Sequence, residues 1–248
     1  MRVAALYDIH GNLPALEAVI RDVRLARADL IVIGGDVVPG PMPRETFAYL
    51  LGLDIPMRFI HGNGDRAVLE LHAGQETIAL PPPVRELARW VAETLDPEHL
   101  RTMAGWPSTL RLEIPGMGEV LFCHATPRND TEIFTRLTPE EALRPVFEGV
   151  DVPLVVCGHT HMQDDRRVGD LRVVNAGSVG MPFGEPGAYW LLLGPDVQLR
   201  RTSYDLERAA GRIRNSDYPQ AQEFAATNVL QPPSEQEILE RFSKVALG

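Results

Sequence analysis

The feature that most constrains the fold is a unit of strand, loop and helix that occurs three times in the first third of the chain. Apolar runs at residues 2–7, 30–33 and 56–60 are each followed by a polar loop, and then by helical stretches at 13–27, about 44–51 and about 66–72. This alternation predicts parallel strands whose carboxyl ends lie at one edge of a sheet. Because the runs are apolar without alternation, we expect a sheet that is buried on both faces.

The rest of the chain is richer in β-structure. Candidate strands occur at 110–114, 119–123, 154–157, 164–168, 171–175, 189–193 and 197–203, and Gly-rich turns between neighbouring segments suggest hairpins. Thr138 with Glu141 predicts a capping box for one intervening helix, and Ser234 with Glu237 predicts a second one near the C-terminus. Two stacked sheets with outer helices agree best with this pattern.

The 248 residues could form one α/β domain or two small ones. We find no internal repeat, and we predict a single domain over 1–248. Residues 74–105 form a helical insertion, in which Pro81, Pro82 and Pro83 precede a stretch with helical spacing. This insertion either packs on the edge of the sheet or forms a cap over the substrate cleft. Residues 204–248 are expected to form C-terminal helices.

The charge and composition of the chain limit the classes of binding partner. The chain has 24 Lys and Arg against 34 Asp and Glu, a net charge of −10, which makes nucleic acid or a membrane surface an unlikely partner. Bound cations can still attract a small anion. No apolar run reaches the ~18–20 residues of a membrane helix, and the stretch before Asp8 is too short for a signal peptide. Cys123 and Cys157 are interpreted as buried strand residues. We expect a cytoplasmic protein, and homo-oligomer formation is left open.

Polar residues of ligand type follow five of the apolar runs. Alternate residues of an extended segment share a side, so Asp8 can face the same point as His10, and His159 the same point as His161. Carboxylates, imidazoles and an amide oxygen suit Mn, Fe, Zn, Ni or Co. The sequence thus predicts a metal site made from the strand-end residues Asp8, His10, Asp36, Asn63, His124, His159 and His161.

The order of these segments carries more information than any one of them. It reads D-x-H, G-D, G-N-x-D, H and G-H-x-H from Asp8 to His161, which is about two thirds of the chain. This string resembles the calcineurin-like metallophosphoesterases. The resemblance implies an α/β fold, a four-layer α/β/β/α sandwich with two central mixed sheets, and one binuclear metal site at the strand ends.

The resemblance also implies a role for each ligand. Asp8, His10 and His161 would hold the first metal, and Asn63, His124 and His159 the second. Asp36 would bridge both, together with a water or hydroxide. The cofactors would be two divalent ions, with Mn as the first choice. The residues expected to take part in catalysis are Asp36, His10, Asn63 and Arg128.

Two further segments indicate a branch of this family. H-A-T-P-R at 124–128 and N-A-G-S-V-G-M-P at 175–182 are similar to the small bacterial and archaeal phosphodiesterases. Arg128 either contacts a substrate phosphate or forms a surface ion pair. Asn12 either binds phosphate or caps the helix from Leu13. Asn175 and Ser178 are expected to support the metal loops.

One position departs from the family pattern. Much of the family has a histidine that protonates the leaving oxygen where this chain has Gly64, and Asp65 is then expected to cap the following helix. His61 either reaches the substrate in its place or is a strand-end residue satisfied by the backbone. A histidine introduced at position 64 is expected to supply the missing proton if it is correctly placed.

We therefore expect a metal-dependent phosphoesterase that acts on a small, nucleotide-like phosphorylated substrate. It would be a phosphodiesterase or a dinucleoside polyphosphate hydrolase that uses a binuclear site and a bridging hydroxide. The alternatives are a Ser/Thr-type protein phosphatase and a non-catalytic metal-binding scaffold, which the retromer sorting subunit of similar fold exemplifies.

Overall fold

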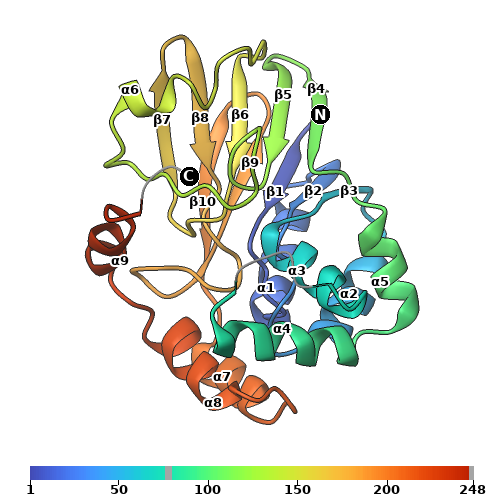
Figure 1. The fold of residues 1–248 in the computed structure, drawn as a ribbon. Helices are drawn as coiled ribbons and strands as arrows, with labels where there is room; N and C mark the ends of the chain where they lie inside the picture. Colours follow the sequence, from blue (N-terminus) through green and yellow to red (C-terminus); the bar gives the residue numbers. More distant parts are fainter. Residues whose placement is uncertain (76–79, 246–248) are drawn as a thin grey trace.

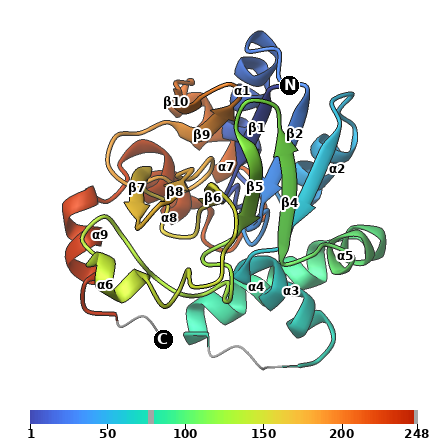
Figure 2. The same cartoon turned by 90° about the horizontal axis from the view of Figure 1, so that it is seen from above.

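Two five-stranded sheets lie face to face at the centre of the molecule, with helices on their outer sides (Figure 1). The computed structural model describes residues 1–75 and 80–245. Side chains from both sheets form the central layer; Val3 and Tyr7 of the first sheet belong to one apolar cluster with Phe122 and Val156 of the second. Figure 2 shows β1 and β2 beside β4 and β5. The predicted fold class, with two mixed sheets flanked by helices, is confirmed.

The first sheet contains the predicted parallel strands. Its order is β10-β9-β1-β2-β3, with β1 parallel to β2 and β2 parallel to β3, and β9 antiparallel to β1. Its strands are β1 (Val3–Leu6), β2 (Leu30–Gly34), β3 (Met57–Ile60), β9 (Ala188–Leu193) and β10 (Val197–Thr202). The helices that follow the first three strands are α1 (Leu13–Leu25), α2 (Pro43–Leu51) and α3 (Asn63–His72).

The second sheet has the order β4-β5-β6-β8-β7. Here β5, β6 and β8 run parallel, and the two edge strands are antiparallel to their neighbours. Its strands are β4 (Thr109–Ile114), β5 (Gly118–Cys123), β6 (Leu154–Cys157), β7 (Asp164–Val168) and β8 (Leu171–Asn175). The ends of β5 and β6 therefore bring their loops to the same edge of this sheet.

The two predicted capping boxes have different outcomes. Ser234 and Glu237 form the expected reciprocal bonds at the start of α9 (Glu235–Phe242). The prediction for Thr138 is wrong, because α6 (Glu140–Leu143) begins after Pro139. The Thr138 hydroxyl instead accepts a hydrogen bond from the Thr135 backbone N–H at 3.0 Å and is used in that turn.

The predicted insertion at 74–105 forms the helices α4 (Pro82–Thr94) and α5 (Pro97–Ala104), although its residues 76–79 lie outside the described part. The C-terminal segment forms α7 (Leu206–Arg214), α8 (Ala221–Phe224), a π-helix (Ala225–Leu230) and α9, and residues 246–248 lie outside the described part. None of the described helices is long and apolar enough to cross a membrane.

Candidate metal centre

All the predicted ligands lie shortly after the carboxyl ends of strands. Asp8 and His10 follow β1, Asp36 follows β2, and His124 follows β5 directly. Asn63 is the first residue of α3, and His159 and His161 lie after β6. The side chains of the two sheets meet there, and most of the ligand residues are buried.

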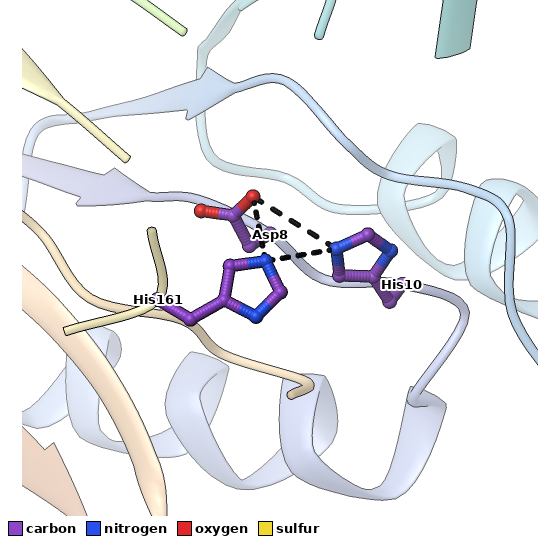
Figure 3. A group of neighbouring side chains, drawn as sticks. All are labelled: Asp8, His10 and His161. Carbon is purple, nitrogen blue, oxygen red and sulfur yellow. Dashed lines mark hydrogen bonds and ion pairs between the residues drawn. The ribbon is translucent and has the colours of Figure 1, made fainter. Parts of the chain in front are cut away.

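The carboxylate of Asp8 is at the middle of the group. Its Oδ1 lies 3.3 Å from His161 Nε2 and 3.8 Å from Nε2 of both His10 and His124. Oδ1 is buried and has no hydrogen-bond partner, whereas Oδ2 accepts from the His159 backbone N–H at 2.9 Å. Figure 3 shows the Asp8, His10 and His161 side chains pointing toward one another. A buried carboxylate oxygen without a partner, surrounded by imidazole nitrogens, fits a bound cation.

Backbone carbonyls orient the two imidazoles nearest to Asp8. His10 Nδ1 lies 3.1 Å from the carbonyl of Pro39, and His161 Nδ1 lies 2.7 Å from the carbonyl of Met181. A carbonyl can only accept, so each Nδ1 carries the hydrogen and each Nε2 faces Asp8. The two Nε2 atoms are 3.2 Å apart. This arrangement is typical of imidazoles that bind one metal ion.

His124 is oriented in the same way. Its Nδ1 lies 3.0 Å from the carbonyl of Gly34, which leaves Nε2 3.5 Å from Asp36 Oδ2 and 3.1 Å from Asn63 Oδ1. His124 is almost fully buried. The imidazole can therefore offer Nε2 to a cation shared with the amide of Asn63.

His159 presents its other ring nitrogen. Its Nε2 lies 3.2 Å from the carbonyl of Thr131, and its Nδ1 lies 3.0 Å from the same terminal atom of the Asn63 amide that faces His124. Asn63, His124 and His159 thus form a second group of ligand atoms beside the first. The assignment of one group to each metal rests on the family resemblance, because the spacing of the residues does not indicate it.

Asp36 lies between the two groups. Its Oδ2 is 3.7 Å from His10 Nε2 and 3.5 Å from His124 Nε2, and its Oδ1 accepts from the Gly64 backbone N–H at 2.7 Å. This position fits a carboxylate that contacts two cations. Asp8 with His10 and His161, and Asp8 with Asp36 and His124, each bring their ligand atoms close enough to hold one ion.

The backbone of the ligand loops is strained. In the described part of the chain, six residues other than glycine have positive φ, and one of them, Arg27, lies elsewhere. Such conformations cost energy in residues with a side chain, and they cluster at functional sites. The other five are all predicted ligands: Asp8 (φ 54°), His10 (47°), Asp36 (52°), His159 (69°) and His161 (59°).

Asp65 has a larger role than the sequence suggested. It caps α3 by accepting from the Gly62 N–H at 3.0 Å, but it also accepts from the Asp36 N–H at 2.8 Å and the Val38 N–H at 3.1 Å. Burial and the charge of Asp36 raise the pKa of Asp65 to about 8 in the absence of cations. Asp65 therefore fixes the Asp36 loop on the start of α3. No local sequence signal pointed to this contact between residues 29 positions apart.

Gly64 is enclosed by the same loop. A Cβ atom at this position would lie 2.6 Å from the Val38 carbonyl oxygen, 2.8 Å from Pro39 Cδ and 3.0 Å from Asp36 Oδ1. The loop thus takes the space beside Gly64, and a histidine cannot be introduced there without moving Asp36. The condition for the expected effect of a histidine at position 64, a correctly placed imidazole, is therefore not met unless this loop moves.

The electrostatics of the site show how its carboxylates act on the imidazoles. Burial opposes a charge on His124, but Asp36 and Asp8 outweigh it and raise its pKa to about 10. Burial also opposes a charge on His161, and Asp8 raises its pKa above the ordinary value. Burial, together with the charge on His124, lowers the pKa of His159 to about 4. Without cations, the buried carboxylates thus favour the protonated form of His124 most strongly.

The residues expected to support the metal loops do so. Asn175 donates to the Gly158 carbonyl at 2.7 Å and to the Thr160 hydroxyl at 3.0 Å. Ser178 donates to the Asp8 carbonyl at 2.8 Å. These bonds tie the loops after β1, β6 and β8 together, which explains how residues far apart in the sequence are held within a few ångströms.

Asn12 and Arg128 have partners within the protein. Asn12 caps α1, because its Oδ1 accepts from the Ala15 N–H at 3.2 Å, and its Nδ2 donates to the Gly180 carbonyl at 2.9 Å. It has no exposed surface, so in this structure the residue is a helix cap rather than a phosphate ligand. Arg128 forms an ion pair with Glu132, with Nη2 to Oε1 at 2.6 Å, and its side chain is 48% exposed.

His61 lies at the rim of the site. Its backbone N–H donates to the Pro107 carbonyl at 3.0 Å, and its Nδ1 is 4.0 Å from Asp130 Oδ2. Arg66 holds that carboxylate through bonds of 2.7 and 2.6 Å. The Asp130 carbonyl oxygen lies 3.1 Å from the Asn63 amide. Asp130 therefore lies between His61 and the second group of predicted ligands.

Comparisons with known proteins agree with this fold and identify the family. The family model described as the calcineurin-like phosphoesterase superfamily domain matches residues 1–194. A solved metallophosphoesterase from Sphaerobacter thermophilus is 28% identical with a TM-score of 0.71, covering 92% of this chain and 99% of that one. The hypothetical protein PH1004 from Pyrococcus horikoshii OT3 has the same fold with a TM-score of 0.80 at 21% identity, covering 94% and 99%. Uncharacterized protein MJ0912 from Methanocaldococcus jannaschii is 26% identical over 243 residues, covering 88% of this chain and 94% of that protein.

Proposed function

The chain belongs to the calcineurin-like phosphoesterase superfamily, and we propose that it hydrolyses phosphodiesters or pyrophosphate-linked nucleotides with two divalent cations. The observation that carries this proposal is the Oδ1 atom of Asp8, which is buried, lacks a hydrogen-bond partner and has three imidazole nitrogens within 3.8 Å. A bound cation would give this oxygen a partner and would allow the surrounding imidazoles to act as neutral ligands.

The proposed ligands are those that the sequence indicated. Asp8, His10 and His161 would hold one cation, Asn63, His124 and His159 the other, and Asp36 both. Two cations in such a site supply an activated water nucleophile and offset negative charge on the phosphate oxygens. The chain itself fixes the geometry, since carbonyls hold Nδ1 of His10, His124 and His161 and leave each Nε2 for a cation. Manganese is the first choice among the metals that suit this ligand set.

The surroundings of Gly64 support the proposed class of ester. The loop of Val38 and Pro39 fills the space beside it, so no side chain at this position can protonate the departing oxygen. Proton donation of this kind contributes about 10²–10⁴-fold in rate. Aryl esters and pyrophosphate-type groups leave as stable anions and tolerate that loss, whereas the alkoxide of phosphoserine does not. The proposal therefore favours a phosphodiesterase over a Ser/Thr protein phosphatase.

Arg128 and His61 are the proposed contacts to the substrate phosphate. The guanidinium of Arg128 is half exposed and is oriented by Glu132, so a phosphate oxygen could share it. The loop that carries Arg128 contacts His159 through the Thr131 carbonyl. A nucleotide-like substrate, a cytoplasmic location and homo-oligomer formation stay predictions.

The test is a comparison of two substrates on the manganese-loaded protein. We expect hydrolysis of bis(4-nitrophenyl) phosphate to exceed that of a phosphoserine peptide by about 100-fold or more in kcat/KM. Equal rates would mean that another acid donates the proton, with His61 as the first candidate. No manganese-dependent hydrolysis of any ester, with two metals bound, would contradict the proposed function and support a metal-binding scaffold.

A further inference from the structure

A cavity of about 240 Å³ opens directly beside the metal site. His10 and Pro39 line it together with Met181, and the rest of its lining comes from α4 and from the C-terminal segment. The residues that matter for its size and chemistry are Leu87, Met181, Tyr218, Gln220, Glu223 and Asn228. Because His10 belongs to both, a group attached to a phosphate at the metal site can extend into this cavity.

The outer wall of the cavity is held in place by its own apolar packing. Leu87 and Trp90 of α4 pack against a cluster that contains Tyr218 and Phe224, and the rings of Trp90 and Tyr218 meet edge to face at 5.4 Å. Figure 1 shows α4 beside α7 and α8 at the lower end of the molecule. The insertion and the C-terminal segment thus form one wall, which is preformed in the absence of substrate.

The chemistry of the wall favours a neutral ring. Leu87, Met181 and Tyr218 provide apolar and aromatic surface, and Gln220 and Asn228 provide amides that can donate and accept hydrogen bonds. Apart from His10, the charged side chain among the lining residues is the carboxylate of Glu223, and no Lys or Arg is among them. A second phosphate would be placed beside a carboxylate with no cation to pair with it.

We propose that this cavity binds the nucleobase of the substrate while the ester phosphate lies at the metal site. This inference rests on the proposed function and narrows it. The substrate is a phosphodiester of a single nucleoside, and a chain of further phosphates does not enter this cavity. Its volume is below the ~300–1,000 Å³ of pockets for larger ligands, which fits one ring system.

Three ligands that share a ribose 5-phosphate test the inference. Adenosine 5′-monophosphate carries a base at C1 of the sugar, ribose 5-phosphate a hydroxyl, and ribose 1,5-bisphosphate a second phosphate. Calorimetry on the manganese-loaded protein should show adenosine monophosphate binding about tenfold or more tightly than ribose 5-phosphate, since stacking of one base contributes this much. Equal binding of these two, or tightest binding of the bisphosphate, would overturn the inference.

A charge reversal adds a second test. Glu223→Arg should increase the affinity for the bisphosphate relative to adenosine monophosphate by about fivefold. Glu207→Arg is the matched control, because Glu207 is exposed on the neighbouring α7 and does not line the cavity. An equal effect of both variants would show a general attraction of anions to the protein and would contradict ligand binding in this cavity.

The two proposals fail in different ways. Base-dependent binding without manganese-dependent hydrolysis would contradict the phosphodiesterase activity and support the cavity. Hydrolysis of bis(4-nitrophenyl) phosphate without any preference for the base would support the activity and contradict the nucleobase site.

Discussion

Gly64→Ala is expected to destabilise the protein although Gly64 lies in a helix. In a helix interior alanine is normally favoured over glycine by about 0.5–1 kcal/mol. Here the added Cβ would meet the Val38 oxygen at 2.6 Å and Pro39 Cδ at 2.8 Å, distances that require a backbone movement. Overpacking of this kind costs about 1–3 kcal/mol. With the helix preference subtracted, the net loss is up to about 2.5 kcal/mol, or up to about 10 °C in Tm for a chain of this size.

Gly211→Ala is the matched control. Gly211 lies inside α7, and a Cβ there would meet no atom within 4 Å, so the same substitution should stabilise by about 0.5–1 kcal/mol. Thermal unfolding followed by circular dichroism, with and without manganese, measures both changes. Because the displaced loop carries Asp36, Gly64→Ala should also bind less metal, as measured by mass spectrometry. Unchanged Tm and metal content in Gly64→Ala would refute the packing argument.

Two further predictions concern the ligands. Asp36→Asn should lose at least one metal and most of the activity while it keeps its circular dichroism spectrum, and full metal content with normal turnover would contradict the bridging role. Metal uptake at pH 7 should release protons, because the pKa of His124 is raised to about 10 by Asp36 and Asp8 against the effect of burial, and a ligand imidazole must be neutral. The metal affinity should therefore rise with pH up to about 10. Calorimetry in buffers with different ionisation heats would count the protons that are released on metal binding. If no proton were released at pH 7, a protonated His124 would be contradicted.

The elements of the fold could be predicted from the sequence because their signals are local. Val3–Leu6 and Leu30–Gly34 are apolar runs that end in glycine or polar loops, and each is completely buried as the pattern indicated. Thr138 shows the limit of such reasoning. Its capping pattern is local too, but the Thr138 hydroxyl accepts a hydrogen bond from the Thr135 backbone N–H and does not cap the helix.

The clustering of the predicted ligand residues could be anticipated from the sequence because they follow strands, but their surroundings could not. Asp65 contacts the Asp36 loop 29 positions earlier, and its pattern in the sequence indicated only a helix cap. The cavity beside His10 depends on how Leu87 of the insertion packs against Tyr218 of the C-terminal segment. Such contacts between distant segments depend on the three-dimensional packing, and no periodicity in the sequence reports them.

The central claim is that two divalent cations lie among the seven ligands. Anomalous diffraction from crystals of the manganese-loaded protein tests it most directly. We predict two peaks about 3.5–4 Å apart, one beside His10 and His161 and the other beside His124 and His159, with Asp36 in contact with both. An absence of peaks at these side chains, or a single peak that leaves His124 and His159 without metal, would contradict the binuclear site.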